Sequence, residues 1–371
     1  MNITNKPKVA LVCDWLTGIG GAERVLLELH RLYPEAPIYT SQYDSKGIDW
    51  FKDADVRTGW LQKLPTSIKK FLPILRAFYF SNLNLDEYDL VISASGAEAK
   101  GIKTGKDTVH IDYCHSPTHY YWSRYDDYLK NPGFEKLDWL ARIGLKLFVG
   151  PMRSWDKKAA QRPDYMIANS THTKKMIQKY YGRNSTIIFP PVDIERFKND
   201  NKQTREGFLI IGRQTPYKRI DLAVKACTDL NLELTVIGDG PEHNNLLKIA
   251  GSSINFLAKP SDEIVNTYFA KSEAFIFPGI DDFGIVAVEA LAAGLPVIAY
   301  KGGGALDYIK TGLNGLFFED QSIDSLKKAL VFFKSFNTNT QKISKSADYF
   351  SNKVFEDNVK TFIDRTLVNF K

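Results

Sequence analysis

The sequence predicts an α/β protein of two Rossmann-like domains, because short apolar runs alternate with helical patterns in both halves of the chain. Each run is rich in β-branched residues and ends at small or polar residues, as strands of a parallel sheet with crossover helices do. A length of 371 residues favours two domains of ordinary size over one oversized core. The expected strands are residues 9–13, 90–93, 108–112 and 165–168 in the first half, and 208–211, 234–237, 274–277 and 296–299 in the second.

A connector near residue 190 separates the two halves. Two prolines follow Phe189 and a polar tract continues to Glu206, so this segment cannot continue a sheet. We expect an N-terminal domain over residues 1–189 and a C-terminal domain over 190–343. Residues 344–371 have apolar positions at helical spacing and should form a helix that packs back on the N-terminal domain. Two such sheets facing each other would bring the carboxyl ends of their strands to a central cleft, where ligands of open α/β sheets bind.

Composition argues against several other classes of protein. The 49 basic and 43 acidic residues leave a net charge of +6, too small an excess in a long chain to indicate nucleic-acid binding. Cys13, Cys114 and Cys227 are odd in number and far apart, which argues against disulfides and a zinc site. The apolar stretch at residues 71–80 is too short to span a bilayer, and the first residues have no signal-peptide pattern. We therefore expect a cytoplasmic protein.

The most informative segment of the second half is residues 278–289, which follow an expected strand and open a helix. Backbone amides of Gly284, Ile285 and Val286 would point from the helix start toward a ligand, which suits a diphosphate. Glu289 lies about a turn further along and could accept hydrogen bonds from a ribose diol, and Asp281 could do the same for sugar hydroxyls. The plainer alternative is that this helix start is merely capped and that Glu289 is solvated.

A second candidate group follows the expected strand at residues 208–211. Thr215 suits a helix cap and Pro216 the first helical position, so Lys218 should project from the first turn. Arg213 and Lys218 could converge on one anionic group and neutralise a departing diphosphate. The alternative is that both are ordinary surface cations. Gly238 to Pro241 and residues 256–259 follow further strands and could border a nucleoside pocket, although such turns occur in many α/β proteins.

These motifs, taken in order, resemble those of the GT-B retaining glycosyltransferases of family 4. Arg213 with Lys218, the Gly-Asp-Gly-Pro turn and the helix whose glutamate follows Asp281 after seven intervening residues carry the likeness, which runs from Gly20 nearly to the end of the chain. Residues 113–117, 216–221 and 282–286 look most like bacterial O-antigen and capsule mannosyltransferases, which implies GDP-mannose as donor. The chain departs from the family where Asp281 replaces the more common glutamate and where Asp307 follows the glycine pair.

The resemblance implies a retaining hexosyltransferase, with α-mannosyl transfer favoured, that acts on a glycan or polyprenyl-linked acceptor in cell-surface polysaccharide synthesis. It implies a nucleotide-sugar donor without a cofactor or a metal. Because no acidic residue is placed beneath the sugar as a nucleophile, we hypothesise front-face attack by the acceptor hydroxyl, assisted by the departing diphosphate. The resemblance assigns catalytic roles to His115, Arg213, Lys218, Asp281 and Glu289. It assigns donor contacts to Gly20, Gly21, Gly212, Gly240, Pro241, Ala258, Lys259, Phe283, Gly284, Ile285 and Val286.

The first half contributes a glycine-rich turn and a histidine. Gly18, Gly20 and Gly21 follow the first strand, but the spacing lacks the third glycine of a dinucleotide fingerprint, so it is weak evidence for NAD. His115 follows the strand at 108–112, and Ser116 with Pro117 should begin a helix that directs the imidazole at the cleft. A structural histidine is the alternative reading. Zinc is not expected, because the chain turns between His115 and the next histidine.

Two basic and apolar segments of the first half suit an anionic membrane surface, which we expect as a partner beside the nucleotide sugar and the acceptor. The alternative is an ordinary amphipathic helix with its cations in water. Two other functions stay open: a sugar-nucleotide epimerase of the same architecture, and a non-catalytic nucleotide-binding protein. The cations concerned are Lys63, Lys69, Lys70 and Arg76 in one segment, and Arg142, Lys146, Arg153, Lys157 and Lys158 in the other.

Overall fold

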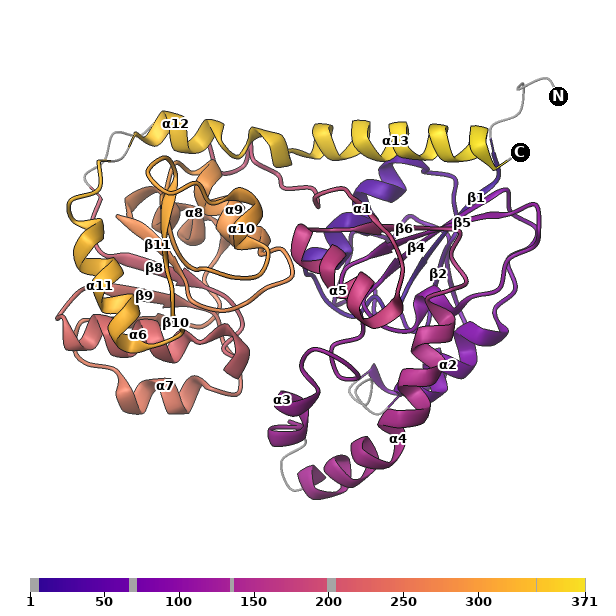
Figure 1. Ribbon diagram of the computed structural model, residues 1–371, viewed down its shortest axis with the longest axis horizontal. Helices are drawn as coiled ribbons and strands as arrows, with labels where there is room; N and C mark the ends of the chain where they lie inside the picture. Colours follow the sequence, from indigo (N-terminus) through magenta and orange to yellow (C-terminus); the bar gives the residue numbers. More distant parts are fainter. Residues whose placement is uncertain (1–6, 67–71, 134–136, 199–204, 338, 371) are drawn as a thin grey trace. The chain divides into compact units, whose positions relative to one another are not determined.

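The structure is a computed structural model, which describes residues 7–66, 72–133, 137–198, 205–337 and 339–370 (Figure 1). The chain forms two compact units. The first comprises Met1–Pro191 and Phe355–Lys371, and the second comprises Val192–Val354. The expected division near residue 190 differs from this boundary by two residues.

The first unit is built on a parallel sheet with the strand order β3-β2-β1-β4-β5-β6-β7. β1 lies between β2 and β4, and its residues 9–13 are buried throughout, as in a strand covered on both faces. The strands are β1 (Val9–Cys13), β2 (Ile38–Thr40), β3 (Val56–Thr58), β4 (Leu90–Ser95), β5 (Val109–Cys114), β6 (Tyr165–Ala168) and β7 (Thr186–Ile187). The helices are α1 (Gly21–Leu32), η1 (Trp60–Lys63), α2 (Pro73–Asn82), η3 (Ala99–Gly101), α3 (Tyr125–Lys130), α4 (Asp138–Ala159) and α5 (Thr171–Tyr181).

The second unit has a parallel sheet with the strand order β10-β9-β8-β11-β12-β13. Its strands are β8 (Phe208–Ile211), β9 (Leu234–Ile237), β10 (Ile254–Leu257), β11 (Ala274–Phe277), β12 (Val297–Tyr300) and β13 (Gly315–Phe318). Its helices are η5 (Pro216–Lys218), α6 (Ile220–Asp229), α7 (His243–Ile249), α8 (Asp262–Lys271), α9 (Ile285–Ala292), α10 (Ala305–Tyr308), α11 (Ile323–Phe333), α12 (Thr340–Lys345) and η6 (Asp348–Phe350). Two parallel-sheet units confirm the predicted GT-B fold class.

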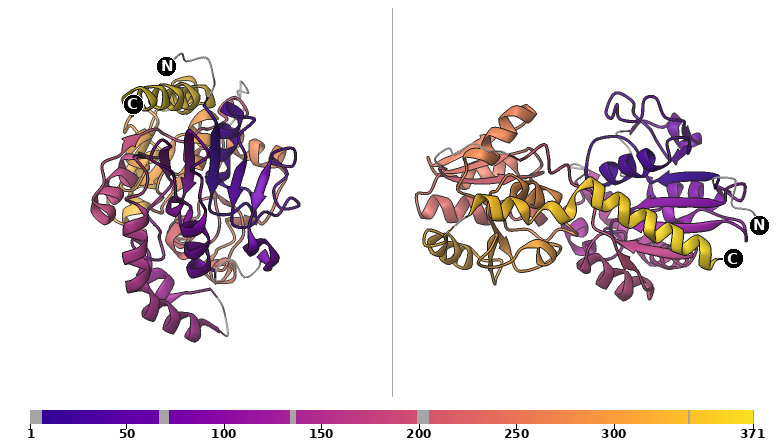
Figure 2. Two further views of the ribbon diagram at one scale, coloured as in Figure 1. Left: turned by 90° about the vertical axis from the view of Figure 1, so that its right-hand side faces the viewer. Right: turned by 90° about the horizontal axis from the view of Figure 1, so that it is seen from above.

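The last helix, α13 (Asn352–Asn369), returns to the first unit, as the sequence predicts. Phe355, Val359 and Ile363 are buried in the core that β1, β4 and α1 form. The returning segment begins later than residue 344, because α12 packs on the second unit, where Ser344 Oγ donates to the carbonyl of Ala292 over 2.7 Å. Figure 2 shows α13 as one continuous helix.

Candidate functional site

In the second unit, the loops that follow β8 and β9 meet at the carboxyl edge of the sheet. The side-chain amide of Gln214 is fully buried and donates to the carbonyl of Gly238 over 2.7 Å, while its oxygen lies 2.8 Å from His243 Nδ1. Gly238 has a φ of 126°, and a Cβ there would lie 2.2 Å from the carbonyl oxygen of Gly212. The turn after β9 is therefore locked against the loop that carries Arg213. Sequence reasoning missed Gln214, since nothing in its neighbourhood distinguishes it from a solvated glutamine.

Lys218 and Asp281 lie together at the same edge. The Lys218 ammonium donates to Asp281 Oδ2, and both side chains are mostly buried. The loop after β11 approaches closely because a Cβ on Gly279 would lie only 2.9 Å from Lys218 Cα. Asp281 Oδ1 is buried and has no hydrogen-bond partner within the described parts of the chain. Such a buried acceptor costs about 1–3 kcal/mol, which a hydroxyl donor of a ligand would remove.

The structure places Arg213 and Lys218 differently from the sequence expectation. A helix begins at Pro216 with Thr215 as its N-cap residue, as expected, but it is the 3-10 helix η5, which ends at Lys218, and Thr215 makes no side-chain capping hydrogen bond. Arg213 lies two residues after the end of β8 and its side chain is exposed, whereas Lys218 is held by Asp281. Both cations therefore belong to the segment that follows β8, and of the two only the Lys218 side chain is held by an ion pair in the described residues.

α9 begins as the sequence predicts. Its N-cap Gly284 has a φ of 91°, and a Cβ there would lie 2.6 Å from the Phe277 ring and 2.8 Å from the Tyr308 hydroxyl. Tyr308 donates to the carbonyl of Phe283 over 2.9 Å, which fixes the loop before the helix. The first amides of a helix have no partner within it and carry its positive dipole end, so the Ile285 end of α9 suits an anion.

The remaining predicted donor residues of the second unit fall into two groups. Glu289 is only 7% exposed, so the alternative reading of a solvated side chain is wrong. Phe283 is buried against Tyr308 and Phe350, where it supports the loop. The others are partly or fully exposed where strands end: Gly212 after β8, Gly240 and Pro241 after β9, Ala258 and Lys259 after β10, and Ile285 and Val286 in the first turn of α9.

The first unit has a cavity of about 240 Å³ at the carboxyl ends of β1, β4 and β5 and the first turn of α1. Gly20 is the N-cap of α1 and Gly21 its first residue, so both lie next to the cavity wall. Gly20 is extended, with a φ of −158°, and does not need the left-handed conformation. The cavity is lined by Cys13, Asp14, Trp15, Leu16, Ala22, Glu23, Leu26, Ala94, Gly96, His115, Ser116, His119, Tyr120 and Tyr128.

Asp14 fixes one wall of this cavity. Its carboxylate accepts hydrogen bonds from the backbone amides of Gly96, Ala97 and Ala99, at 2.8, 2.9 and 2.7 Å. The loop after β4 is thereby tied to the end of β1. Sequence reasoning missed Asp14, although it is the first polar residue after a buried strand and so stands where a parallel sheet places functional groups.

His115 follows β5 directly and lines the cavity. Its backbone is held on both sides, because its amide donates to the carbonyl of Ser95 over 2.7 Å and its carbonyl accepts from Asn169 Nδ2 over 2.8 Å. Ser116 and Pro117 lie in irregular backbone, so the helix expected there is wrong, and α3 begins only at Tyr125. Within the described residues, no group of three His, Cys, Asp or Glu side chains could hold a metal ion.

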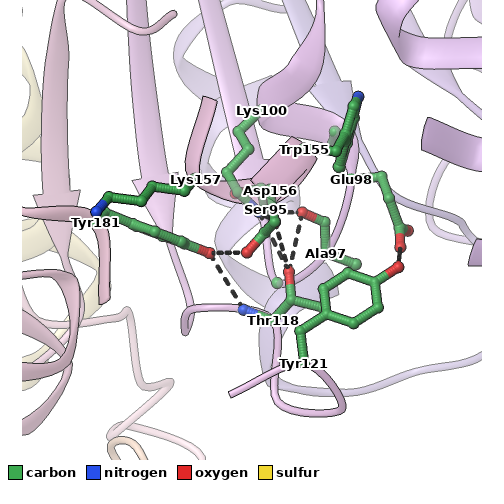
Figure 3. A network of polar contacts seen from close by, with 12 residues as sticks. Ser95, Ala97, Glu98, Lys100, Thr118, Tyr121, Trp155, Asp156, Lys157 and Tyr181 are labelled. Carbon is green, nitrogen blue, oxygen red and sulfur yellow. Dashed lines mark hydrogen bonds and ion pairs between the residues drawn. The ribbon is translucent and has the colours of Figure 1, made fainter. Parts of the chain in front are cut away.

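A buried polar network holds the segment after His115 in place (Figure 3). Lys100 and Asp156 form a fully buried ion pair of 2.8 Å, and the Asp156 carboxylate also accepts from the hydroxyls of Thr118 and Tyr181. Burial disfavours the charged form of Lys100, but the charge and hydrogen bond of Asp156 together with the neighbouring Tyr181 and Cys114 raise the pKa of Lys100 well above its usual value. Since Asp156 belongs to α4, this helix positions the cavity wall.

The lining of the cavity has a distinctive charge. Asp14 and Glu23 contribute carboxylates, Trp15, Tyr120 and Tyr128 contribute aromatic rings, and no Lys or Arg is among the lining residues. Arg76 lies behind the wall, where its guanidinium is 4.7 Å from the centre of the Trp15 ring and bonds Glu98. Aromatic faces beside hydroxyl-accepting groups suit a hydroxylated ring more than an anion.

Each unit matches a family model of known proteins. Residues 19–196 match the model described as Glycosyltransferase Family 4, and residues 191–348 match the one described as Glycosyl transferases group 1.

Relatives and solved structures agree with these matches. The chain is 25% identical to the alpha-1,3/1,6-mannosyltransferase ALG2 of Candida glabrata, over 82% of this chain and 78% of that protein. It is also 25% identical to the GDP-mannose-dependent alpha-(1-6)-phosphatidylinositol monomannoside mannosyltransferase of Mycobacterium tuberculosis, over 48% of this chain and 54% of that one. Anabaena HepE, solved with UDP-glucose, has a similar fold, with a TM-score of 0.68 and 17% identity, over 97% of this chain and 100% of that chain. The chain spans about half the length of most curated relatives it matches.

Proposed function

Because the chain carries a family 4 glycosyltransferase domain followed by a group 1 glycosyltransferase domain, we propose that it is a retaining hexosyltransferase with a nucleotide-sugar donor. The second unit binds the donor and the first unit holds the acceptor. GDP-mannose is the favoured donor, since the mycobacterial protein similar to this chain is named as dependent on it. The acceptor is a glycan or a polyprenyl-linked sugar of a cell-surface polysaccharide.

The observation that carries the proposal is the pairing of Lys218 with Asp281 beside the start of α9. Lys218 and the first amides of α9 supply positive charge for a diphosphate. Asp281 Oδ1, buried and without a partner among the residues described, accepts a hydrogen bond from a hydroxyl of the donor sugar. An anion site and a hydroxyl acceptor on neighbouring loops are what a sugar diphosphate requires.

The proposed reaction is a front-face substitution at the anomeric carbon of the donor. The acceptor hydroxyl attacks on the face from which the diphosphate leaves, so the new glycosidic bond has the anomeric configuration of the donor. The hydroxyl proton passes to an oxygen of the departing diphosphate. Lys218 and the exposed Arg213 stabilise the charge that grows on that group, which is an electrostatic form of catalysis. No protein nucleophile is required.

The cavity beside His115 holds the acceptor sugar in this proposal. Its carboxylates and its lack of lysine and arginine favour a neutral sugar, because an acidic sugar or a phosphorylated ring would meet like charge. The aromatic side chains of Trp15, Tyr120 and Tyr128 offer apolar faces to the ring. His115 forms part of the same wall and supports the positive charge that develops on the reacting sugar.

The test is a transfer assay with GDP-mannose, UDP-glucose and simple acceptors. Each donor is incubated with octyl α-mannoside, octyl α-glucoside or octyl glucuronide, and released nucleotide and product anomer are measured by chromatography and NMR. We expect acceptor-dependent release of GDP and an α-linked product from neutral acceptors. Conversion of a nucleotide sugar to its epimer without acceptor would indicate an epimerase instead. Binding without any turnover would indicate a non-catalytic protein.

A further inference from the structure

The first half of α4 exposes apolar side chains on the face that points away from the rest of its unit. Leu147 is 67% exposed and Trp139 59% exposed. Spacings of four and eight residues place Trp139, Ile143 and Leu147 on one helix face. In Figures 1 and 2, α4 extends away from the sheet of its unit. The exposed apolar residues of α4 are Trp139, Leu140, Ile143, Leu147 and Phe148.

The second half of the same helix is anchored. Met152, Asp156 and Ala159 are buried, and Asp156 is bound in the network around Lys100. Trp155 Nε1 donates to Ser81 Oγ over 3.0 Å, which fixes α4 beside α2. The apolar half therefore extends from an anchored helix end, with Pro151 between the two halves.

α2 adds exposed apolar side chains of its own. Ile74, Leu75 and Phe78 share one face of this helix, and Phe78 is 63% exposed. Arg76, which the sequence grouped with the cations of this region, is instead buried and bonded to Glu98 over 2.7 Å. The expected role of Arg76 at a membrane surface is therefore wrong. Lys69 and Lys70 lie outside the described residues.

Three cations lie along α4 beside its apolar face. No acidic residue occurs between Asp138 and Asp156, whereas Arg142, Lys146 and Arg153 do. Arg142 lies 3.6 Å from Asp138 and Arg153 Nε donates to the carbonyl of Tyr121, so of these three Lys146 is the exposed one. Lys146 is exposed and lies beside Ile143 on the helix surface. An anionic bilayer attracts an exposed cation at the edge of such a face while it takes up the apolar side chains.

We propose that the outward face of α4, from Trp139 to Phe148, lies in the interface of an anionic lipid bilayer. The helix lies on the bilayer and does not cross it: among the described helices, none is long and apolar enough to do so. Because α4 also carries Asp156, which accepts from Thr118 three residues after His115, the membrane face and the support of the cavity wall belong to the same helix.

Vesicle flotation tests the proposal without any nucleotide or sugar. The chain is mixed with vesicles of phosphatidylcholine alone or with 30 mol% phosphatidylglycerol. We expect flotation only with the anionic vesicles and weaker flotation at high salt. Leu147→Glu should reduce the partition coefficient about tenfold or more, because an apolar contact is replaced by a repelled charge. Lys146→Glu should reduce it about fivefold or more.

A matched control lies on α11 of the second unit. Phe332 is 62% exposed, and Phe332→Glu should leave flotation unchanged. Circular dichroism melts of all variants should match the wild type, since these side chains are exposed. Flotation of Leu147→Glu equal to that of the wild type, or no flotation of the wild type, would overturn the proposal. The proposal would also be overturned if the wild type sedimented as a dimer, Leu147→Glu sedimented as a monomer, and this monomer still floated. The apolar face would then contact a second copy of the chain.

Discussion

The Lys218 ammonium bonds one oxygen of the Asp281 carboxylate, while the other oxygen of that carboxylate is buried with no hydrogen-bond partner in the described residues. A cation and an unsatisfied acceptor are thus prearranged on two loops at one sheet edge. Preorganised charge costs no reorganisation when a ligand binds, which is why such sites stabilise transition states strongly.

Replacing Lys218 by alanine should slow sugar transfer by about 100 to 1,000-fold, because one preorganised donor to the leaving group is lost. Single-turnover kinetics with saturating donor measure this effect. Lys310→Ala, at an exposed lysine elsewhere in the second unit, is the control. An unchanged rate for Lys218→Ala would refute its role in stabilising the departing diphosphate.

Gly284→Ala should weaken donor binding and destabilise the second unit. Its φ of 91° is unfavourable for alanine, by about 1–2 kcal/mol, and the new Cβ would also collide with Phe277 and Tyr308. Gly182→Ala separates these causes, because Gly182 has a φ of 69° but a Cβ added there would meet no atom within 4 Å. We expect Gly182→Ala to cost stability without changing donor affinity, measured by calorimetry. Equal donor affinity in Gly284→Ala and the wild type would contradict the proposed anion site.

His115→Gln should reduce transfer to the acceptor and leave the affinity for GDP unchanged, since His115 lines the cavity of the first unit and the proposed nucleotide site lies on the second. Calorimetry with GDP and a transfer assay on the same preparation separate the two properties. A variant that transfers sugar as fast as the wild type would show that His115 is a structural residue, the alternative that the sequence left open.

The stability of the first unit should respond to pH through His110 and Asp112, which both bond Ser93 in its core. Burial lowers the pKa of His110 to about 3, and burial raises the pKa of Asp112 to about 6. Below pH 6.5 His110 is protonated only in the unfolded chain, which lowers stability as the pH falls. Between pH 6 and 4 Asp112 is protonated in the folded chain but still charged in the unfolded chain. This carboxyl therefore makes the first unit more stable as the pH falls through that range.

Asp112→Asn removes the second contribution only. It should stabilise the first unit at pH 7 by up to about 3 kcal/mol, because a carboxylate with its pKa raised from 3.8 to about 6 is costly to keep charged. The advantage should shrink as the pH falls toward 4. Urea unfolding followed by tryptophan fluorescence measures this unit alone, because all six tryptophans precede residue 191. A variant less stable than the wild type at pH 7 would contradict the sign.

The fold was largely predictable because buried parallel strands leave a plain signal. Residues 9–13, 165–168, 208–211, 234–237 and 274–277 were predicted with the bounds that the structure shows. The short strands β2, β3 and β7 of the first sheet were not, since two or three residues carry no periodicity and form strands only by pairing with a neighbour. The helix expected at Ser116 did not form because the segment bonds Tyr181 and Asp156 instead.

The candidate site was predictable where one residue type determines the geometry. Gly284 and the start of α9 follow from the conformational freedom of glycine. The pairing of Lys218 with Asp281, and the clamps made by Gln214 and Asp14, depend on contacts between loops distant in sequence. Periodicity and local spacing contain no information on such contacts. The sequence therefore indicated where charge gathers but not which charges bond each other.

The most direct test of the central claim is the binding of GDP and UDP to the wild type and to Lys218→Ala. If Lys218, Asp281 and the start of α9 form a diphosphate site, a nucleoside diphosphate at 100 times its dissociation constant should stabilise the wild type against unfolding by about 2.7 kcal/mol. Lys218→Ala should bind the same nucleotide at least tenfold more weakly. Stabilisation of neither protein by GDP or UDP, or equal affinity in both, would contradict the claim.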